Sequence, residues 1–182
     1  MPSERYGTTL LAPNKYTTPL GEMEVSAHVC RSPFIREVEM VLPNHDLKNL
    51  VCIPTMQHAR EDLVKVGDEI EVEKDRLLEN FMEFAKALCG LLGDEGHFAD
   101  YIDPCSGLAM ITRDANKVYS EVDGAQQLLG YAVHNAGCCK ILLHPAWNSS
   151  VYPASIFTTA PPEALTRELF EQSITMMKKN SV

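Results

Sequence analysis

The sequence lacks the features that would place the protein in a membrane or on nucleic acid. No apolar run among its 182 residues approaches the roughly 20 residues needed to span a bilayer. Basic residues are in the minority, with 16 Lys and Arg against 25 Asp and Glu and a formal net charge of -9. A phosphate backbone or an anionic lipid surface binds a basic protein face. We therefore expect neither nucleic acid nor a membrane as a partner.

The chain start and the cysteine spacing lack the marks of secretion and of structural zinc. Residues 1–5 do not show the order of a signal peptide, in which a basic segment precedes an apolar one. None of the cysteines forms a Cys-x-x-Cys motif, which argues against a zinc ribbon and a thioredoxin-type redox pair. We expect a soluble, non-secreted protein with reduced thiols. The six cysteines are Cys30, Cys52, Cys89, Cys105, Cys138 and Cys139.

No glycine-rich loop precedes a predicted helix. Gly90, Gly93 and Gly96 stand at the end of a helical apolar pattern that begins near Asp75, where a C-terminal cap belongs. A phosphate-binding loop lies before a helix instead. The isolated chain is therefore predicted to bind neither flavin nor nucleotide.

The patterns that are present predict a single α+β domain. With 45% hydrophobic residues the chain can form one substantial core, and its strands and helices follow one another without repeating βαβ units. Residues 1–20 are rich in proline and threonine and predict an extended arm before a domain over residues 21–182. The predicted strands cover residues 23–30, 50–53, 69–73, 108–112, 138–144 and 151–158. The predicted helices cover residues 33–42 and 75–92, a turn at 126–129, and a last helix from 161.

The segment from Gly137 to His144 joins two adjacent thiols to an apolar run typical of a buried strand. Successive strand side chains point to opposite faces. One predicted face holds Cys139, Ile141 and Leu143, and the other holds Cys138, Lys140, Leu142 and His144.

This alternation gives the two thiols different predicted surroundings. Cys139 is predicted to pack as a small hydrophobe, whereas an ammonium and an imidazole on the face of Cys138 favour its reactive thiolate. A turn signal just before Gly137 places the thiols at an exposed loop-to-strand junction. The alternative is that both are ordinary core cysteines, and the segment alone leaves that alternative open.

A second thiol lies in a predicted turn over residues 103–107. Its Asp, Pro, Ser and Gly residues supply the chemistry of a tight turn. Cys105 is a weaker nucleophile candidate, because no recognised nucleophile motif surrounds it.

Several segments resemble the CblD family, the cobalamin-trafficking proteins of methylmalonic aciduria and homocystinuria type D. The resemblance is ordered along the chain and dense from about Glu69 to Thr159. Cys105 departs from the family pattern, in which serine is expected. The matching segments are 96–109 (GHFADYIDPCSGLA), 129–133 (LGYAV), 137–140 (GCCK), His144, Trp147 and 155–158 (SIFT).

The resemblance implies a flavin-free, nitroreductase-like α/β sandwich that works as an adaptor rather than as an enzyme. Its partner would be the cobalamin-processing protein CblC. In the family the first cysteine of Gly-Cys-Cys, here Cys138, is a thiolate ligand to the cobalt of cobalamin held by that partner. Gly137, Cys139, Lys140 and His144 would support it. The complex would direct cobalamin to methionine synthase or methylmalonyl-CoA mutase.

Two further expectations follow. The family's longer members carry an N-terminal extension with a mitochondrial leader that is not seen here, so the cytoplasm is the expected location and a mitochondrial pool the alternative. The polar segment from Arg113 to Ala136, next to the thiols, is expected to contribute to the CblC interface.

A thiol- or flavin-dependent oxidoreductase is the rival function, and it would need a bound chromophore or a resolving cysteine.

Overall fold

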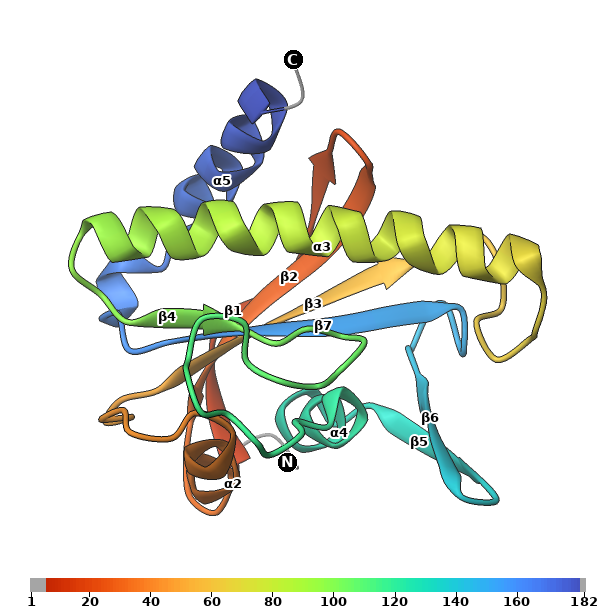
Figure 1. The fold of residues 1–182 in the computed structure, drawn as a ribbon, viewed down its shortest axis with the longest axis horizontal. Coiled ribbons are helices and arrows are strands. Elements are labelled where there is room, and N and C mark those ends of the chain that lie inside the picture. The colour runs from red at the N-terminus through yellow and green to blue at the C-terminus, as the bar shows by residue number, and fades with distance from the viewer. Residues whose placement is uncertain (1–5, 181–182) are drawn as a thin grey trace.

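A five-stranded antiparallel sheet forms the centre of the computed structural model, which describes residues 6–180 (Figure 1). The strand order is β1-β2-β3-β7-β4, and a separate two-stranded sheet pairs β5 with β6. The strands are β1 (Gly7–Thr18), β2 (Gly21–Cys30), β3 (Val51–His58), β4 (Ala99–Tyr101), β5 (Ala132–Ala136), β6 (Cys139–Leu143) and β7 (Val151–Thr158). The helices are α2 (Phe34–Val41), α3 (Asp68–Asp94), α4 (Glu121–Leu129) and α5 (Arg167–Asn180), with a short 3-10 helix at Pro162–Ala164.

Helices cover both faces of the sheet (Figure 1). On one face, α3 and α5 pack Phe84 and Phe170 against Ile53 of β3. On the other, α2 packs Phe34 against Cys52, the neighbour of Ile53 in the strand. Because successive strand residues face opposite sides, β3 is buried on both faces. This arrangement confirms the predicted α+β class. No helix within residues 6–180 has the length and apolar character to cross a bilayer.

Most predicted elements are present. The strands predicted at residues 23–30 and 151–158 are β2 and β7, and the helical turn predicted at residues 126–129 belongs to α4. The helix predicted at residues 33–42 is α2, which starts one residue later. Ser26 and His28, which alternate with the apolar residues of β2, are buried too, because helices and loops cover that face as well.

Pro54 does not interrupt its strand, and Pro153 likewise lies within β7, opposite Met56. The strand predicted to end at Pro54 continues to His58, and Pro54 lies opposite Ser155 of β7. Proline removes a donor from the ladder but leaves its carbonyl free to accept. The burial of both faces of β3 outweighs that loss.

The expected arm over residues 1–20 is part of the sheet from Gly7 onward. β1 pairs with β2 from Gly7↔Cys30 to Thr18↔Gly21, with register irregularities between Thr9 and Leu11 and between Leu11 and Asn14. These irregularities and Pro13 obscure the period-2 pattern that marks a strand in the sequence. Residues 1–5 of the expected arm lie outside the described residues.

The strand predicted at residues 69–73 is wrong, because these residues form the first turns of α3. Ile70, Glu73 and Leu77 are buried at helical spacing. The carboxylate of Glu73 accepts from Arg76 Nε at 2.6 Å, which compensates for its burial. An alternation of glutamate and apolar residues thus belongs to a helix whose first turn is acidic, as the helix dipole favours.

The strand predicted at residues 108–112 is also wrong. The segment makes one isolated β-bridge, and a side chain takes the place of a neighbouring strand. The buried carboxylate of Asp100 accepts from the backbone amides of Ile111 at 2.9 Å and Thr112 at 2.7 Å. Those amides are therefore satisfied without a sheet partner.

Candidate functional site

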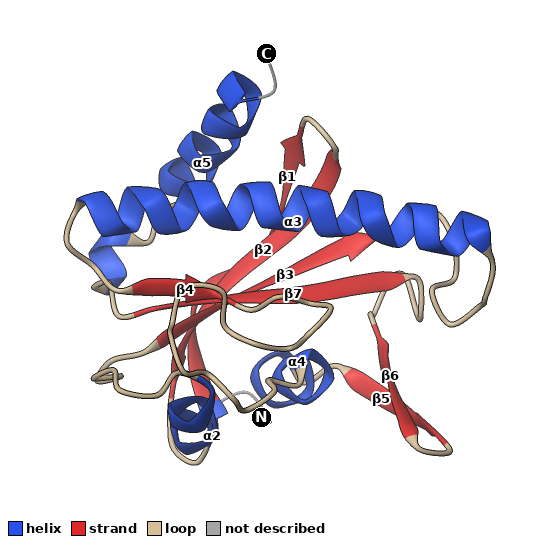
Figure 2. Cartoon of the chain, in the orientation of Figure 1, coloured by secondary structure: helices blue, strands red, loops and turns tan. Residues whose placement is uncertain are grey.

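Cys138 lies at the turn of the β5–β6 hairpin, which extends away from the main sheet (Figure 2). The strands pair from Ala132↔Leu143 to Ala136↔Cys139, so Gly137 and Cys138 make a two-residue turn. Gly137 has a φ of 65°, a left-handed conformation that most side chains disfavour. The Gly-Cys sequence thus forms a tight turn that places the first thiol at the tip.

Both thiols are exposed, and their Sγ atoms lie 3.7 Å apart. This exposure confirms the predicted loop-to-strand junction. The prediction that Cys139 packs in the core is wrong. Leu142 is the buried side chain of β6, whereas Ile141 and Leu143 are half-buried. The cause is the position of Cys139 next to the hairpin turn, because burial along β6 falls from Leu142 toward the tip, where Cys139 and Lys140 are both exposed.

The cations predicted on the face of Cys138 have other partners. Lys140 Nζ donates to Asp123 Oδ1 of α4 at 2.9 Å. His144 is 5% exposed and follows the far end of β6, about 20 Å along the chain from Cys138 at roughly 3.3 Å per residue. The imidazole and the thiol therefore do not share one environment, contrary to the prediction.

His144 belongs to a group of stacked rings at the base of the hairpin. The Trp147 ring stacks on the imidazoles of His144, at 3.8 Å between centroids, and of His58, at 5.0 Å. His144 Nδ1 accepts from the Ala146 amide at 3.1 Å, so Nε2 carries the proton and donates to Glu24 Oε1 at 3.1 Å. These contacts fix the base of the hairpin to β2 and β3.

The sequence did not identify this ring group. Glu24 sits 120 positions before His144, and the alternation of β2 indicated only a solvated glutamate. Trp147 belonged to the family resemblance, but no spacing in the chain connects it with His58. The folded sheet alone brings these residues together.

Three of the cysteines are buried, and burial makes their thiols unreactive by raising the thiol pKa. It raises the pKa of the Cys30 thiol to about 12 and that of the Cys89 thiol to about 12. Burial also raises the pKa of Cys52 well above its usual range. These thiols keep their protons at neutral pH and pack as small hydrophobes.

Cys105 is exposed, but its surroundings oppose ionisation. It lies in the predicted turn, which is confirmed: Asp103 Oδ1 accepts from the Cys105 amide at 3.0 Å, and the Gly107 amide donates to the Asp103 carbonyl at 2.7 Å. Partial desolvation and the negative charge of Asp103 raise the pKa of the Cys105 thiol. The turn that exposes Cys105 thus also disfavours its nucleophilic form.

The adjacent thiols at the hairpin interact with each other. The hydrogen bond and the charge of the Cys138 sulfur raise the pKa of Cys139. A thiolate at Cys138 would therefore oppose loss of the proton from Cys139. This pair can offer one thiolate to an approaching electrophile or soft metal centre.

Within the part of the chain that the structure describes, no three His, Cys, Asp or Glu residues converge as a metal site.

The segments that carry the family resemblance include the hairpin turn and also parts of the main sheet away from it. Residues 96–109 run from the end of α3 through β4 into the confirmed turn, and residues 129–133 join α4 to β5. Residues 155–158 form the last half of β7. A family model for the methylmalonic aciduria and homocystinuria type D protein matches residues 9–169. This chain belongs to that family.

Curated relatives of the type D protein family agree with the match. The Cobalamin trafficking protein CblD of Homo sapiens is 34% identical over 142 residues, and that of Gallus gallus is 33% identical over 143 residues. The matches cover 78% and 79% of this chain and 48% of each relative. The chain therefore spans about half the length of the curated relatives it matches. The predicted CblD resemblance is confirmed.

Proposed function

We propose that this chain is a cobalamin-trafficking adaptor in which the Cys138 thiolate ligates the cobalt of cobalamin held by a CblC-like processing protein. The observation that carries the proposal is the pair of exposed thiols at the tip of a hairpin that extends from the main sheet. A soft thiolate suits a soft or borderline cobalt centre. Cobalamin is the cargo, and the partner supplies the rest of its binding site.

The hairpin fits this role by its length and its support. Five strand residues at about 3.3 Å each extend roughly 17 Å, which is long enough for the hairpin turn to enter a cavity of the partner protein. Within residues 6–180, no atom beyond its chain neighbours lies within 4 Å of the position of a Cβ on Gly137, so the turn has room for a partner. The Cys139 sulfur contacts that of Cys138 at 3.7 Å. Lys140 holds β6 to α4, and His144 holds the base, as positioning residues.

The proposal gives the chain no catalytic turnover. The complex would hold cobalamin as a protected thiolate form and direct it to methionine synthase or methylmalonyl-CoA mutase in the cytoplasm or mitochondrion. The α+β fold would be a flavin-free member of the nitroreductase-like class. The curated relatives, which are named trafficking proteins, support a transport role.

A visible spectrum of the chain mixed with cobalamin-loaded CblC tests the proposal. We expect a new cobalt–sulfur absorption band that Cys138→Ser abolishes, because a hydroxyl is a poor soft ligand. Cys105→Ser is the matched control, since it removes an exposed thiol elsewhere and should leave the band unchanged.

Retention of the full band in Cys138→Ser would contradict the ligand assignment. The spectrum of the isolated chain separates the proposal from the oxidoreductase alternative. Stoichiometric flavin in the purified protein would support the oxidoreductase and overturn the adaptor.

A further inference from the structure

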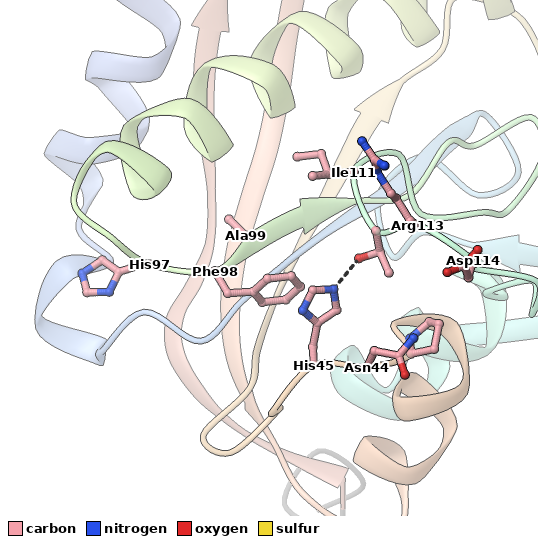
Figure 3. A pocket seen from close by; sticks show the side chains of 10 residues that line it. Asn44, His45, His97, Phe98, Ala99, Ile111, Arg113 and Asp114 are labelled. Atoms are coloured by element: carbon pink, nitrogen blue, oxygen red, sulfur yellow. Dashed lines mark hydrogen bonds between the residues drawn. The ribbon is translucent and has the colours of Figure 1, made fainter.

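A cavity of ≈ 460 Å³ lies apart from the hairpin thiols, between the loop after α2, the segment that enters β4 and the loop at residues 111–114 (Figure 3). Figure 3 shows the rings of Phe98 and His45 in its centre, with His97 on one side and Arg113 on the other. The ring centroids of His45 and Phe98 are 4.3 Å apart. The cavity thus combines an aromatic surface with groups that can carry positive charge.

His45 is oriented by a chain of hydrogen bonds that ends at a buried carboxylate. Asp100 is 0% exposed and accepts from Thr112 Oγ1 at 2.5 Å as well as from backbone amides. Since that bond uses the hydroxyl proton of Thr112, its oxygen accepts from His45 Nε2 at 3.1 Å. Nε2 therefore carries a proton, and Nδ1 is left to interact with a ligand.

The Thr112 hydroxyl fixes the orientation of the imidazole ring, so that Nδ1 faces a ligand while Nε2 stays bonded to Thr112. In its doubly protonated form an imidazole donates at both nitrogens, here to Thr112 on one side and to the ligand on the other. The arrangement supplies an oriented donor without any movement of the backbone.

Arg113 adds a permanent positive charge. Among the described residues, no carboxylate forms an ion pair with it, although Asp114 is its neighbour in the chain and also lines the cavity. His97 lines the cavity and lies 3.9 Å from Glu95, a residue that does not line it. In a chain of net charge -9, an unpaired guanidinium beside a cavity is a specific feature. A guanidinium binds a carboxylate or phosphate through two parallel hydrogen bonds.

We propose that this cavity binds a small organic oxyanion. Its carboxylate or phosphate group would lie against Arg113 and His45, and its apolar body against Phe98 and Ile111. Ile111 is 55% exposed in the structure, and a ligand body would cover it. The proposal does not depend on cobalt ligation by the hairpin, because none of the cysteines lines the cavity.

Titration of the isotope-labelled chain with benzoate, phenyl phosphate and benzyl alcohol, followed by NMR, tests the site. We expect saturable shifts of the Thr112 and Arg113 backbone amides with at least one of the two anions and none with the neutral alcohol. Arg113→Gln should weaken anion binding about 10-fold or more, the contribution of a charge-assisted bidentate pair. Arg36→Gln removes one exposed charge from α2 and should change nothing.

The tighter of the two anions identifies the class of oxyanion. Shifts that do not saturate with either anion, or an unchanged affinity in Arg113→Gln, would overturn the proposal. Equal binding of benzyl alcohol would also overturn it, because it would show a site that selects apolar bodies only. The Cys138→Ser variant should bind the anions normally, which keeps this result separate from the proposed cobalt chemistry.

Discussion

The side chain of Cys139 contacts solvent, so replacing its sulfur by oxygen removes no core packing. We expect Cys139→Ser to change the free energy of unfolding by less than about 0.5 kcal/mol, as at other surface positions. Cys89→Ser is the matched control. It places a hydroxyl among apolar side chains of the α3 core and should cost about 1 to 3 kcal/mol. Urea denaturation measures both, and equal losses would contradict the exposure of Cys139.

Glu121, the first residue of α4, gives the protein a pH-sensitive stability. Burial raises the pKa of its carboxyl to about 7, although its oxygens accept from the Ser155 amide at 3.1 Å and hydroxyl at 2.6 Å. In the unfolded chain a glutamate titrates near about 4.3. The folded chain binds this proton more tightly, so the contribution of Glu121 to stability is present below about pH 4.3 and is lost as pH rises through about 7.

We expect Glu121→Gln to remove this dependence. Between pH 5 and pH 8 the free energy of unfolding of the wild type should fall relative to the variant by on the order of 1 to 3 kcal/mol. Urea denaturation at several pH values measures the difference between the two proteins. A difference that stays constant over this range would show that the carboxyl is not desolvated in the fold.

His28 acts in the opposite direction and has to be separated from this effect. Burial lowers the pKa of its imidazole to about 4. Its contribution to stability is therefore present above the usual value of about 6.5 and is lost as pH falls toward 4. Comparing the wild type with Glu121→Gln cancels this contribution, because His28 is the same in both proteins.

At the scale of elements, the hairpin depends on the rings at its base. A two-stranded hairpin alone is marginally stable in water. We expect Trp147→Leu to speed hydrogen exchange of the β5 and β6 amides about 10-fold or more, because it removes the stacking on His144 and His58. The amides between β3 and β7 should change less. Exchange followed by NMR measures each strand separately.

His134→Ala is the control within the same hairpin, since His134 is exposed on β5. It should leave exchange of the hairpin amides close to that of the wild type. Similar acceleration in both variants would indicate that the hairpin is held by its own strand pairing and not by the rings.

The sequence predicted elements best where one period ran uninterrupted. Regular alternation identified β2, and helical spacing identified most of α3. Prediction failed at residues 69–73, where a glutamate alternation satisfies both the strand and the helix pattern. It failed again at residues 108–112, because the Asp100 carboxylate takes the place of a strand. Such a side chain, eleven or more positions away, leaves no periodic signal.

For the candidate site, the sequence identified the residues better than their surroundings. The strand alternation and the family resemblance both selected Cys138, whose role as a ligand stays a prediction, and the turn signal placed it at a junction where the thiol is exposed. Alternation predicted which face of the strand carries Cys139, but the predicted burial of its side chain was wrong. Alternation does not say whether another layer of the fold covers either face. The support from Glu24 and His58 depends on strand pairing far apart in the sequence.

For the whole molecule, the loop before α4, α4 itself and the first hairpin strand, β5, form one continuous segment over residues 113–136 that ends next to the thiols. We expect hydrogen exchange in this segment to slow when the CblC complex forms, because a partner that reaches Cys138 also covers the neighbouring surface. Mass spectrometry of the free and bound chain measures the change. The exposed side of α3 around Val72 is the internal control, since the hairpin and α3 lie on opposite sides of the sheet (Figure 1).

Unchanged exchange over residues 113–136 in a complex that shows the cobalt–sulfur band would remove this segment from the interface. Slowing over α3 as well would point to a general stabilisation of the chain.

The two edge strands of the main sheet, β1 and β4, are poorly suited to pair with a strand of another copy of the chain. β1 contains Pro13 and a broken register, and β4 is three residues long. Beyond β4, the Ile111 and Thr112 amides are already bonded to Asp100. An edge strand that is short or kinked, or whose amides are already bonded, is a poor template for a further strand, and this disfavours aggregation. By bonding these two amides, Asp100 keeps them from pairing with a strand of a second copy of the chain.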